Sequence, residues 1–440
     1  MKIEITNHDK WHHSLTIKLA LLAILGLLFF IPLEMIKEII RERQSSADKV
    51  KKEISDQWAE KQIFSGPVIN IPVRTVPSEK DEKPVTGIWH ILPENLDITG
   101  TVKPEIRYRG IYQSVVYDSD LKIDGYFVIP GEEALKDHEI LWNEAYYTAG
   151  ITDNRGIKGK IMLKIDSHQP EAEPGVRDTD IFESGITFDS PLLSPGEKVS
   201  FDMSINLSGS EGLQFTPLGR STSVFLQSEW DSPSFTGSFL PVKRNIDETG
   251  FTAEWEVTHL NRNFPQSWTG NAFHPQGSAF GLDLYQPVDH YQKAWRSSRY
   301  GMLFIALTFL VLIFIEISRK EAIHIFHYFL VALGLVLFFS LLNSLSEHTG
   351  FNLAYLISSV STILLISIFT GTLFREKRIA LIIFGMLAVL YTFIYVLLTL
   401  ENSAYLIGNI GLFVLLAIIM IFSARLEPFK KEKLSSEYKD

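Results

Sequence analysis

Cysteine is absent from the 440 residues of this sequence. Its absence excludes disulfide bonds, thiolate metal sites, iron–sulfur clusters and cysteine nucleophiles. A domain in an oxidising compartment can fold without disulfides if its hydrophobic core is large enough. The mostly polar stretch of residues 38–297 is long enough to form such a core.

Basic residues are scarce in this same stretch. Residues 38–297 contain 26 Lys and Arg against 39 Asp and Glu, so their balance is 26 − 39 = −13. The rest of the chain has 15 basic and 12 acidic residues, a balance of +3. Because phosphate binding needs clustered Lys and Arg, we do not expect nucleic acid as a partner.

Familiar catalytic motifs are also missing. The sequence has no P-loop and no G-x-G-x-x-G, H-E-x-x-H or G-x-S-x-G pattern. Ser46–Lys49 matches the S-x-x-K of penicillin-interacting serine enzymes, but the partner patterns Ser-Asp-Asn and Lys-Thr-Gly are absent. We therefore expect no enzyme activity, no cofactor and no metal.

Long apolar runs, by contrast, are abundant. The first, Leu19–Leu33, is not followed by a small-x-small cleavage site, so it is interpreted as an uncleaved anchor rather than a signal peptide. Apolar residues at helical spacing extend this helix to about Lys61. Five further runs are each near the ~20 residues that span a bilayer: Tyr300–Ile317, Ile325–Leu342, Leu353–Phe374, Ile379–Leu400 and Tyr405–Phe422.

The basic residues of the short connections predict the orientation of these six spans. The connections 343–352 and 401–404 contain no Lys or Arg. The other connections and the segment after the last span carry the basic residues Arg319, Lys320, Arg375, Lys377, Arg378, Arg425, Lys430, Lys431 and Lys433. The positive-inside rule therefore predicts that both termini are cytoplasmic and that residues 38–297 are extracytoplasmic.

Residues 62–285 have the pattern of many short strands. Segments such as Leu96–Val102 and Lys160–Ile165 are rich in alternating apolar residues, and turn signals such as Pro130-Gly131 separate them. This pattern predicts a large β-rich domain, sandwich-like in architecture.

The predicted fold is an α-helical membrane protein with six spans and a large extracytoplasmic β-rich domain. Its parts are a cytoplasmic tail (1–14), a transmembrane anchor (15–36), a helical extension (37–61), the β-rich domain (62–297), a five-helix transmembrane bundle (298–424) and a second cytoplasmic tail (425–440).

Several short segments along the chain resemble the CreD family of inner-membrane "cell envelope integrity" proteins. They are Arg107–Tyr112, Ser267–Phe273, Pro287–Gln292, Tyr300–Phe309, Ser344–Phe351, Leu400–Tyr405 and Gly411–Phe413. In order and spacing they cover nearly the whole chain. The resemblance implies a bacterial inner-membrane protein linked to envelope stress, and it supplies no established catalytic or ligand-binding residues.

Two groups of residues in the β-rich domain are candidates for function. Arg107, Arg109 and Tyr112 place cations and aromatic rings together, which suits an anionic envelope component such as a phospholipid headgroup or a glycan. The alternative is an internal brace, with an arginine paired to Asp118 or Asp120. Trp268 and Asn271 are predicted to lie in an aromatic joint between this domain and the bundle.

The remaining candidates lie at the ends of the spans. Glu316 is expected either to pair with Arg319 or Lys320 or to form a polar cluster with His324 and His327. In the outer connections, the candidates are Glu347, His348 and Glu401. They would serve as a helix cap or a docking contact, or Glu347 and His348 would act as an acid–base pair.

The leading functional hypothesis is non-enzymatic: the β-rich domain binds or senses an envelope lipid, glycan or protein, and the bundle anchors it in the bilayer. The alternative is a transporter or lipid-handling protein, in which Glu316 and the hydroxyl residues of 353–374 line a route through the bundle.

Overall fold

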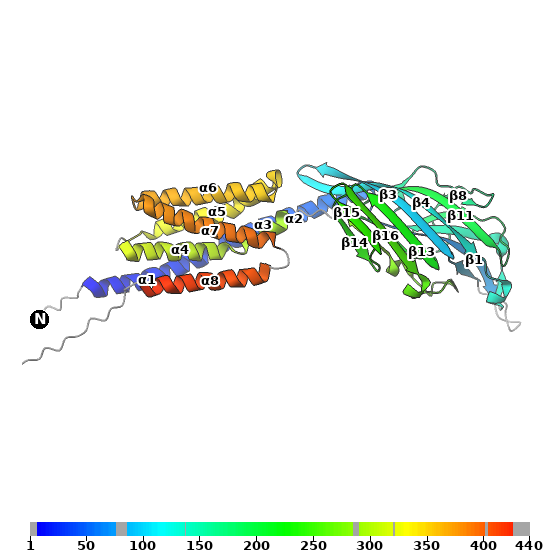
Figure 1. Ribbon diagram of the computed structural model, residues 1–440, viewed down its shortest axis with the longest axis horizontal. Helices are drawn as coiled ribbons and strands as arrows, with labels where there is room; N and C mark the ends of the chain where they lie inside the picture. The colour runs from blue at the N-terminus through cyan, green and yellow to red at the C-terminus, as the bar shows by residue number, and fades with distance from the viewer. Residues whose placement is uncertain are drawn as a thin grey trace, which may run out of the picture. The chain divides into compact units, whose positions relative to one another are not determined.

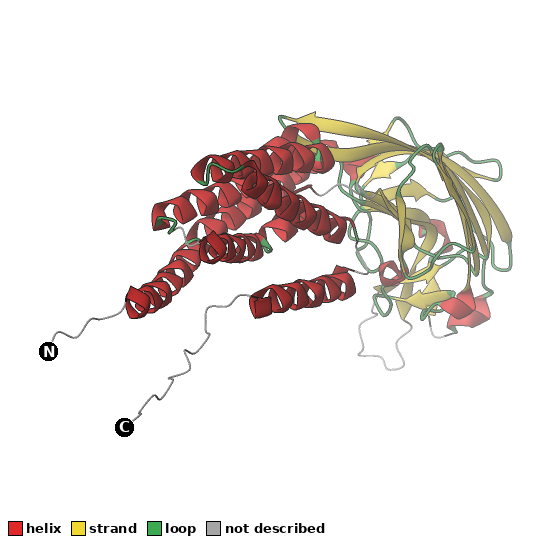
Figure 2. Ribbon diagram, turned by 60° about the vertical axis from the view of Figure 1, so that its left-hand side comes forward, coloured by secondary structure: helices red, strands yellow, loops and turns green. Residues whose placement is uncertain are grey.

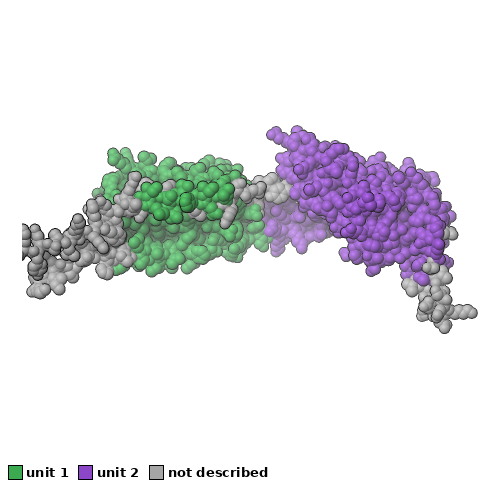
Figure 3. All heavy atoms as spheres, turned by 60° about the horizontal axis from the view of Figure 1, so that its bottom comes forward, with its two compact units in different colours: residues 1–46, 289–440 green, residues 47–288 purple. Residues whose placement is uncertain are grey.

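The computed structural model describes residues 7–75, 86–136, 138–284, 290–319, 322–400 and 404–425. The chain forms two compact units, shown in different colours in Figure 3. The first, which we call the helical unit, comprises residues 1–46 and 289–440. The second, which we call the β unit, comprises residues 47–288.

The apolar runs form helices, which satisfy all backbone hydrogen bonds within one segment and therefore suit a lipid environment. The described residues contain the following α-helices (Figure 1): α1 (Asn7–Leu28), α2 (Phe30–Trp58), α3 (His290–Ser298), α4 (Gly301–Arg319), α5 (Ile325–Thr349), α6 (Phe351–Leu373), α7 (Lys377–Thr399) and α8 (Ala404–Arg425).

Five helical segments among the described residues are long and apolar enough to cross a membrane. They are Ile17–Trp58, Tyr291–Arg319, Ile325–Thr349, Phe351–Leu373 and Lys377–Thr399. They coincide with the first five predicted spans, two of which were predicted to end one residue later, at Phe374 and Leu400. The sixth predicted run coincides with α8, which is not one of these five segments, so the count of six spans stays a prediction.

Aromatic side chains form the centre of the helical unit. The ring of Tyr391 on α7 lies 4.5 Å from that of Phe304 on α4 and 4.7 Å from that of Phe338 on α5, measured between centroids. Gly301 lets α4 approach α2 closely, because a Cβ atom at this position would lie only 2.5 Å from Leu33 Cδ2. The first part of α2 is therefore packed within the helical unit.

The alternating segments of the β unit form two mixed sheets, drawn in yellow in Figure 2. In sheet A the strand order is β14-β18-β12-β1-β6-β10-β9, with β2 and β5 paired to β1, and β17 paired to β2. Its strands are β1 (Gln62–Thr75), β2 (Thr86–Ile91), β5 (His138–Ile140), β6 (Tyr146–Ile151), β9 (Glu173–Pro174), β10 (Gly185–Asp189), β12 (Gly212–Phe215), β14 (Pro233–Gly237), β17 (Ser267–Thr269) and β18 (Phe280–Leu284).

Sheet B has the strand order β15-β16-β13-β3-β4-β11-β7, with β8 also paired to β11. Its strands are β3 (Asn95–Arg109), β4 (Tyr112–Val128), β7 (Ile157–Lys158), β8 (Leu163–Ile165), β11 (Lys198–Ser210), β13 (Ser221–Ser228), β15 (Lys243–Asp247) and β16 (Gly250–Thr258). Most neighbours are antiparallel, but β1 pairs with β12 and β3 pairs with β13 in parallel.

One hydrophobic core lies between the two sheets. Alternate residues of strands such as β3 and β13 point into it, as the period of two requires. Phe127 of sheet B lies 5.9 Å from Tyr147 of sheet A, and Trp255 of sheet B lies 5.9 Å from Phe280 of sheet A. The predicted β-rich domain is thus confirmed as two mixed sheets that share a core.

We expect Trp255→Ala to lower the free energy of unfolding of the β unit by about 3–5 kcal/mol, because it empties a fully buried site in this core. Phe225→Ala is the matched control, since Phe225 lies on the neighbouring strand β13 with a partly exposed ring, and should cost less than about 1 kcal/mol. Urea-dependent proteolysis of the purified full-length protein measures both. Equal losses in the two variants would contradict the assignment of the core.

Candidate functional site

The last turn of α2 is built into the β unit through Trp58. The indole Nε1 of Trp58 donates a hydrogen bond to the Tyr117 carbonyl on β4, at 3.3 Å. The guanidinium of Arg107 and the ammonium of Lys158 lie 5.0 and 4.8 Å from the centre of the same ring. These cation–π contacts attach the helix end to both β3 and β7.

Residues on either side of Trp58 strengthen this attachment. The hydroxyls of Ser55 on α2 and Ser210 on β11 are hydrogen-bonded, and both side chains are buried. Ala59, directly after the helix, is fully buried, and its carbonyl accepts a hydrogen bond from Ser210 at 2.8 Å. The end of α2 is therefore buried in the β unit as a core element would be.

Arg107, Arg109 and Tyr112 lie on the β3–β4 hairpin, which turns at Gly110 with φ of +65°. Arg107 pairs with Glu105 at 2.8 Å, and Arg109 pairs with Glu53 of α2 at 3.0 Å. Tyr112 is the cross-strand partner of Arg109. Both arginines thus contact α2 or its terminal tryptophan, as a brace would.

The two carboxylates considered as partners for these arginines have other partners. Asp118 pairs with Lys158 at 2.5 Å, and Asp120 pairs with Lys103 at 2.5 Å. The Lys158 ammonium and the Ser208 hydroxyl hold the pKa of Asp118 below its usual value, although burial opposes them. The sequence did not reveal these pairings because they depend on the register of β3, β4 and β11.

Trp268 and Asn271 lie in the part of the β unit around β17. Asn271 is exposed, whereas Trp268 is buried, with its ring 5.5 Å from that of Phe273 and 5.7 Å from that of His90. β17 pairs with β2, and this pairing places Trp268 beside His90. The contacts given for Trp268 are therefore internal to the β unit.

Arg262 organises the segment that leads to β17. Its guanidinium is buried and donates hydrogen bonds to the carbonyls of Phe264 and Leu218, at 3.0 and 3.3 Å, and to Gln266 Oε1 at 2.5 Å. Burial, with the nearby charge of Arg220, lowers the pKa of Arg262 to about 10. This side chain holds the loop between β16 and β17 against the sheet.

A polar row crosses sheet A next to Trp268. His90 on β2 is the direct cross-strand neighbour of Trp268 on one side and of Asn70 on the other, and Asn70 in turn is paired with Tyr146 on β6. The intervening Trp89 and other alternate residues of these strands point into the core between the sheets. The polar row therefore lies on the opposite face of sheet A.

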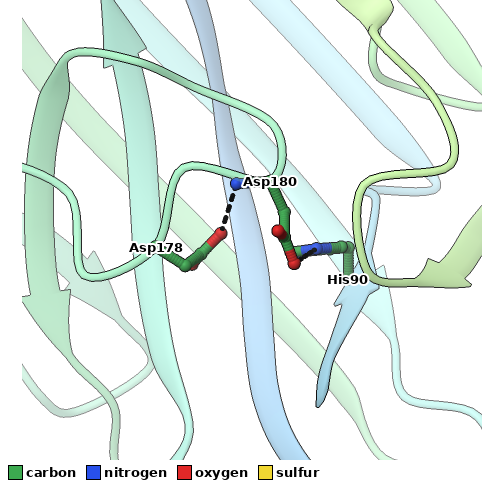
Figure 4. A group of neighbouring side chains, drawn as sticks. All are labelled: His90, Asp178 and Asp180. Atoms are coloured by element: carbon green, nitrogen blue, oxygen red, sulfur yellow. Dashed lines mark hydrogen bonds and ion pairs between the residues drawn. The ribbon is translucent and has the colours of Figure 1, made fainter.

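The loop before β10 brings two carboxylates to this row (Figure 4). Asp180 Oδ2 lies 3.5 Å from His90 Nε2, and one ligand atom each of His90, Asp178 and Asp180 lies within 4.8 Å of the others. His90 is fully buried, and its Nδ1 lies 2.7 Å from Asn70 Oδ1. Burial lowers the pKa of His90, and the charges of Asp178 and Asp180 oppose this shift.

No pattern in the sequence predicts that these three side chains lie together. His90 lies in a strand, and the two aspartates follow nearly ninety residues later in a loop without a metal-ligand spacing. The only local signal was the Asp-Thr-Asp string of residues 178–180 after a Pro-Gly turn. The pairing of β2 with β1, and of β6 with β10, brings the three side chains together.

In the helical unit, Glu316 is buried among three helices. Its carboxylate is paired with the ammonium of Lys18 from α1 and accepts a hydrogen bond from the Tyr328 hydroxyl of α5 at 2.9 Å. Lys18 also donates to the carbonyl of Ile323 at 2.5 Å. The partners of Glu316 thus come from distant parts of the chain.

The other residues considered with Glu316 have separate roles. Arg319 pairs with Glu376, and Lys320 lies outside the described residues. His324 is the N-cap of α5, where its Nδ1 accepts a hydrogen bond from the Phe326 amide at 3.2 Å. The described residues contain no hydrogen bond or ion pair between Glu316 and His324.

Glu347 lies near the end of α5, within contact distance of two other parts of the helical unit. Its Oε1 is 3.4 Å from the Tyr291 hydroxyl of α3 and 3.7 Å from Arg43 Nε of α2. His348 is exposed in the last turn of the same helix. Glu401 lies outside the described residues. Glu347 therefore ties α2, α3 and α5 together.

These features define a multi-pass helical membrane protein that carries a large β unit of two sheets. A family model described as inner membrane protein CreD matches residues 14–428. The inner membrane protein CreD of Escherichia coli (strain K12) is 31% identical over 411 residues, which is 91% of each chain. The present chain belongs to the CreD family of inner membrane proteins.

Among solved structures, a mutant two-domain M1 zinc metallopeptidase bound to L-tryptophan is matched with 10% identity and a TM-score of 0.19. The match covers 44% of this chain and 42% of that chain. A likeness at this level carries no argument about fold or activity.

We expect Glu316→Gln to lower the free energy of unfolding of the helical unit by about 3 kcal/mol, because it leaves the Lys18 charge without its counter-charge. Adding Lys18→Met should restore most of that loss. Thermal unfolding of the detergent-solubilised protein measures the variants. Glu376→Gln, which breaks a more exposed ion pair, is the control and should cost less than about 1 kcal/mol. A double variant no more stable than Glu316→Gln would show that the pairing is unimportant.

Proposed function

We propose that this protein supports cell envelope integrity by a non-catalytic route. Its β unit binds or senses an envelope component outside the cytoplasm, and α2 passes the state of the β unit to the membrane helices. In this proposal the chain has six spans, both termini are cytoplasmic and residues 38–297 are extracytoplasmic. The charge distribution of the connections supports this orientation.

The observation that carries the proposal is the shared helix α2. Its first part packs within the helical unit, where Leu33 and Ile40 are almost completely buried. Its last turn is fixed in the β unit by Trp58 and Ser55. An α-helix transmits displacement and rotation along its axis because each of its peptide groups is hydrogen-bonded to the next turn. A structural change in the β unit near Trp58 would thus displace or rotate the part of α2 that packs against the membrane helices.

The β3–β4 hairpin is the surface we assign to the envelope component. Tyr108 at its tip has 69% of its surface exposed, and Ile106 and Ile111 are also exposed. Arg107 and Arg109 add positive charge to this apolar tip within an otherwise acidic unit. Exposed aromatic and cationic groups together favour an anionic component with an apolar part, such as a phospholipid. The same arginines contact Trp58 and Glu53, so an occupied hairpin would bear directly on α2.

The proposal is tested by making α2 flexible where the two units divide. The triple variant Ser45→Gly, Ser46→Gly, Asp48→Gly changes exposed positions and should destabilise the helix locally by about 3 kcal/mol relative to alanine. We expect it to fail to rescue the envelope-stress defect of a deletion strain.

The matched control changes the same three residues to alanine, which removes the same side chains but keeps the helix. It should rescue like the natural protein at equal membrane levels. Equal rescue by the glycine and alanine variants would refute transmission through α2.

A second candidate function is the passage of a small polar solute or lipid headgroup through the bundle. One observation favours it: the hydroxyls of Ser358 and Ser367 on α6 are buried and have no hydrogen-bond partner among the described residues. Buried hydroxyls without partners are costly in a purely structural role. The two hydroxyls would have hydrogen-bond partners if they lined a polar route that a solute or headgroup occupies.

This candidate predicts that the double variant Ser358→Ala, Ser367→Ala loses rescue while it accumulates and unfolds normally. A packing role predicts the opposite, because removing an unpaired hydroxyl is neutral or stabilising. Ser361→Ala, at an exposed position of the same helix, is the control. Full rescue by the double variant would rule out a route along α6.

A further inference from the structure

The orientation of the His90 ring creates an unresolved electrostatic conflict in the β unit. Asn70 Nδ2 donates a hydrogen bond to Thr148 Oγ1 at 2.9 Å, which leaves Asn70 Oδ1 as the acceptor for His90 Nδ1–H. In the neutral ring the proton is then on Nδ1, and the lone pair is on Nε2. This Nε2 is buried and has no hydrogen-bond partner in the described part of the chain, and Asp180 Oδ2 lies 3.5 Å from it.

A lone pair that faces a carboxylate is repelled by it unless a positive charge lies between them. Among the described residues, no Lys or Arg forms an ion pair with Asp178 or Asp180. The neighbouring Arg177 pairs instead with Asp189, at 2.5 Å.

The surroundings of the two carboxylates orient them without neutralising them. The Tyr146 hydroxyl donates to Asp178 Oδ2 at 2.5 Å, and the amide of Asp180 donates to Asp178 Oδ1 at 3.1 Å. Asn70 Oδ1 likewise orients the His90 ring through its hydrogen bond with Nδ1. Outer partners of this kind, an acceptor on the second imidazole nitrogen and donors to the carboxylates, are typical of metal ligands.

The spacing also suits a small divalent ion. Zinc binds imidazole nitrogen and carboxylate oxygen at about 2.0–2.2 Å, so two tetrahedral ligands lie about 3.3 Å apart. The His90–Asp180 separation of 3.5 Å already matches this value. The whole set lies within 4.8 Å, and rotation of the partly exposed Asp178 side chain would complete it. One imidazole and two carboxylates form a three-ligand site with a fourth position open to water.

We propose that His90 Nε2 and the carboxylates of Asp178 and Asp180 bind a first-row divalent transition-metal ion of the Zn²⁺ class. The ion would join the loop before β10 to the outer face of sheet A. The proposal concerns a site that is separate from α2 and the β3–β4 hairpin, and it does not depend on the sensing role.

Zn²⁺ binding to the full-length protein, purified without a histidine tag, tests the proposal. All variants carry His8→Gln, His12→Gln and His13→Gln, which remove a competing cluster of histidines near the N-terminus. In competition with a chromogenic chelator, we expect one equivalent of Zn²⁺ to bind, and His90→Gln and Asp180→Asn each to weaken that binding by at least tenfold. His168→Gln and Glu183→Gln, which change exposed residues outside the group, should leave it unchanged.

Two further measurements keep the result independent of folding. Asp178→Asn keeps one oxygen acceptor for the Tyr146 hydroxyl and loses only the acceptor for the Asp180 amide, at a partly exposed position. It should therefore preserve the protease-resistance pattern while weakening Zn²⁺ binding. Co²⁺ bound in place of Zn²⁺ should give the visible spectrum of a four-coordinate nitrogen–oxygen site, and this spectrum should be lost in His90→Gln. Absence of the bound equivalent, or binding that persists at full strength in the three site variants, would overturn the proposal in favour of a protonated His90–Asp180 ion pair.

Discussion

Glu316 can be buried between helices only because Lys18 balances its charge and Tyr328 donates a hydrogen bond to it. A charge without a partner in this position would cost several kcal/mol, more than the packing of one side chain returns. The pairing therefore fixes where α1, α4 and α5 meet. A similar requirement operates in the β unit, where Nη1 and Nη2 of the buried Arg262 guanidinium donate hydrogen bonds to carbonyl and amide oxygens rather than to a carboxylate.

His90 is where this requirement is not met by the protein alone. Its Nδ1 is hydrogen-bonded to Asn70, whereas its Nε2 faces the carboxylates of Asp178 and Asp180. These carboxylates accept hydrogen bonds, but among the described residues no Lys or Arg forms an ion pair with them. The contrast between Arg262 and His90, which both lie near β17, is the reason for assigning a ligand to one and a structural role to the other.

The helix α2 contributes residues to both units. Its last turn is held by a hydrogen bond, by two cation–π contacts and by a buried pair of serines. Such an end resists fraying, which an exposed helix terminus would not do. The arginines of the β3–β4 hairpin, predicted as a binding patch or a brace, have brace contacts, and their hairpin nevertheless exposes apolar residues at its tip. Both properties belong to one hairpin because its two strands are longer than the sheet needs.

The apolar runs predicted where the membrane helices lie, since a run near twenty residues long has few alternatives in a membrane. Most of the predicted outer connection 343–352 is nevertheless helical, because α5 continues to Thr349. Alternation and turn residues likewise determined that residues 62–285 are rich in strands. Strand order was not predictable: the parallel pairing of β3 with β13 joins segments that local patterns cannot relate. Glu316 could be selected from the sequence as an unusual carboxylate, but its partner Lys18 could not, because about three hundred residues separate them.

The sequence by itself determined the class of this protein, the position of its membrane segments and its β-rich part, because each depends on local periodicity and composition. Only the tertiary structure decided which polar groups meet. The His90 group illustrates the reason: its three side chains come from a strand and a distant loop, and their separation is set by the register of sheet A. Hydrogen bonds and ion pairs act over a few ångströms, so they depend on the fold and leave no periodic trace in the chain.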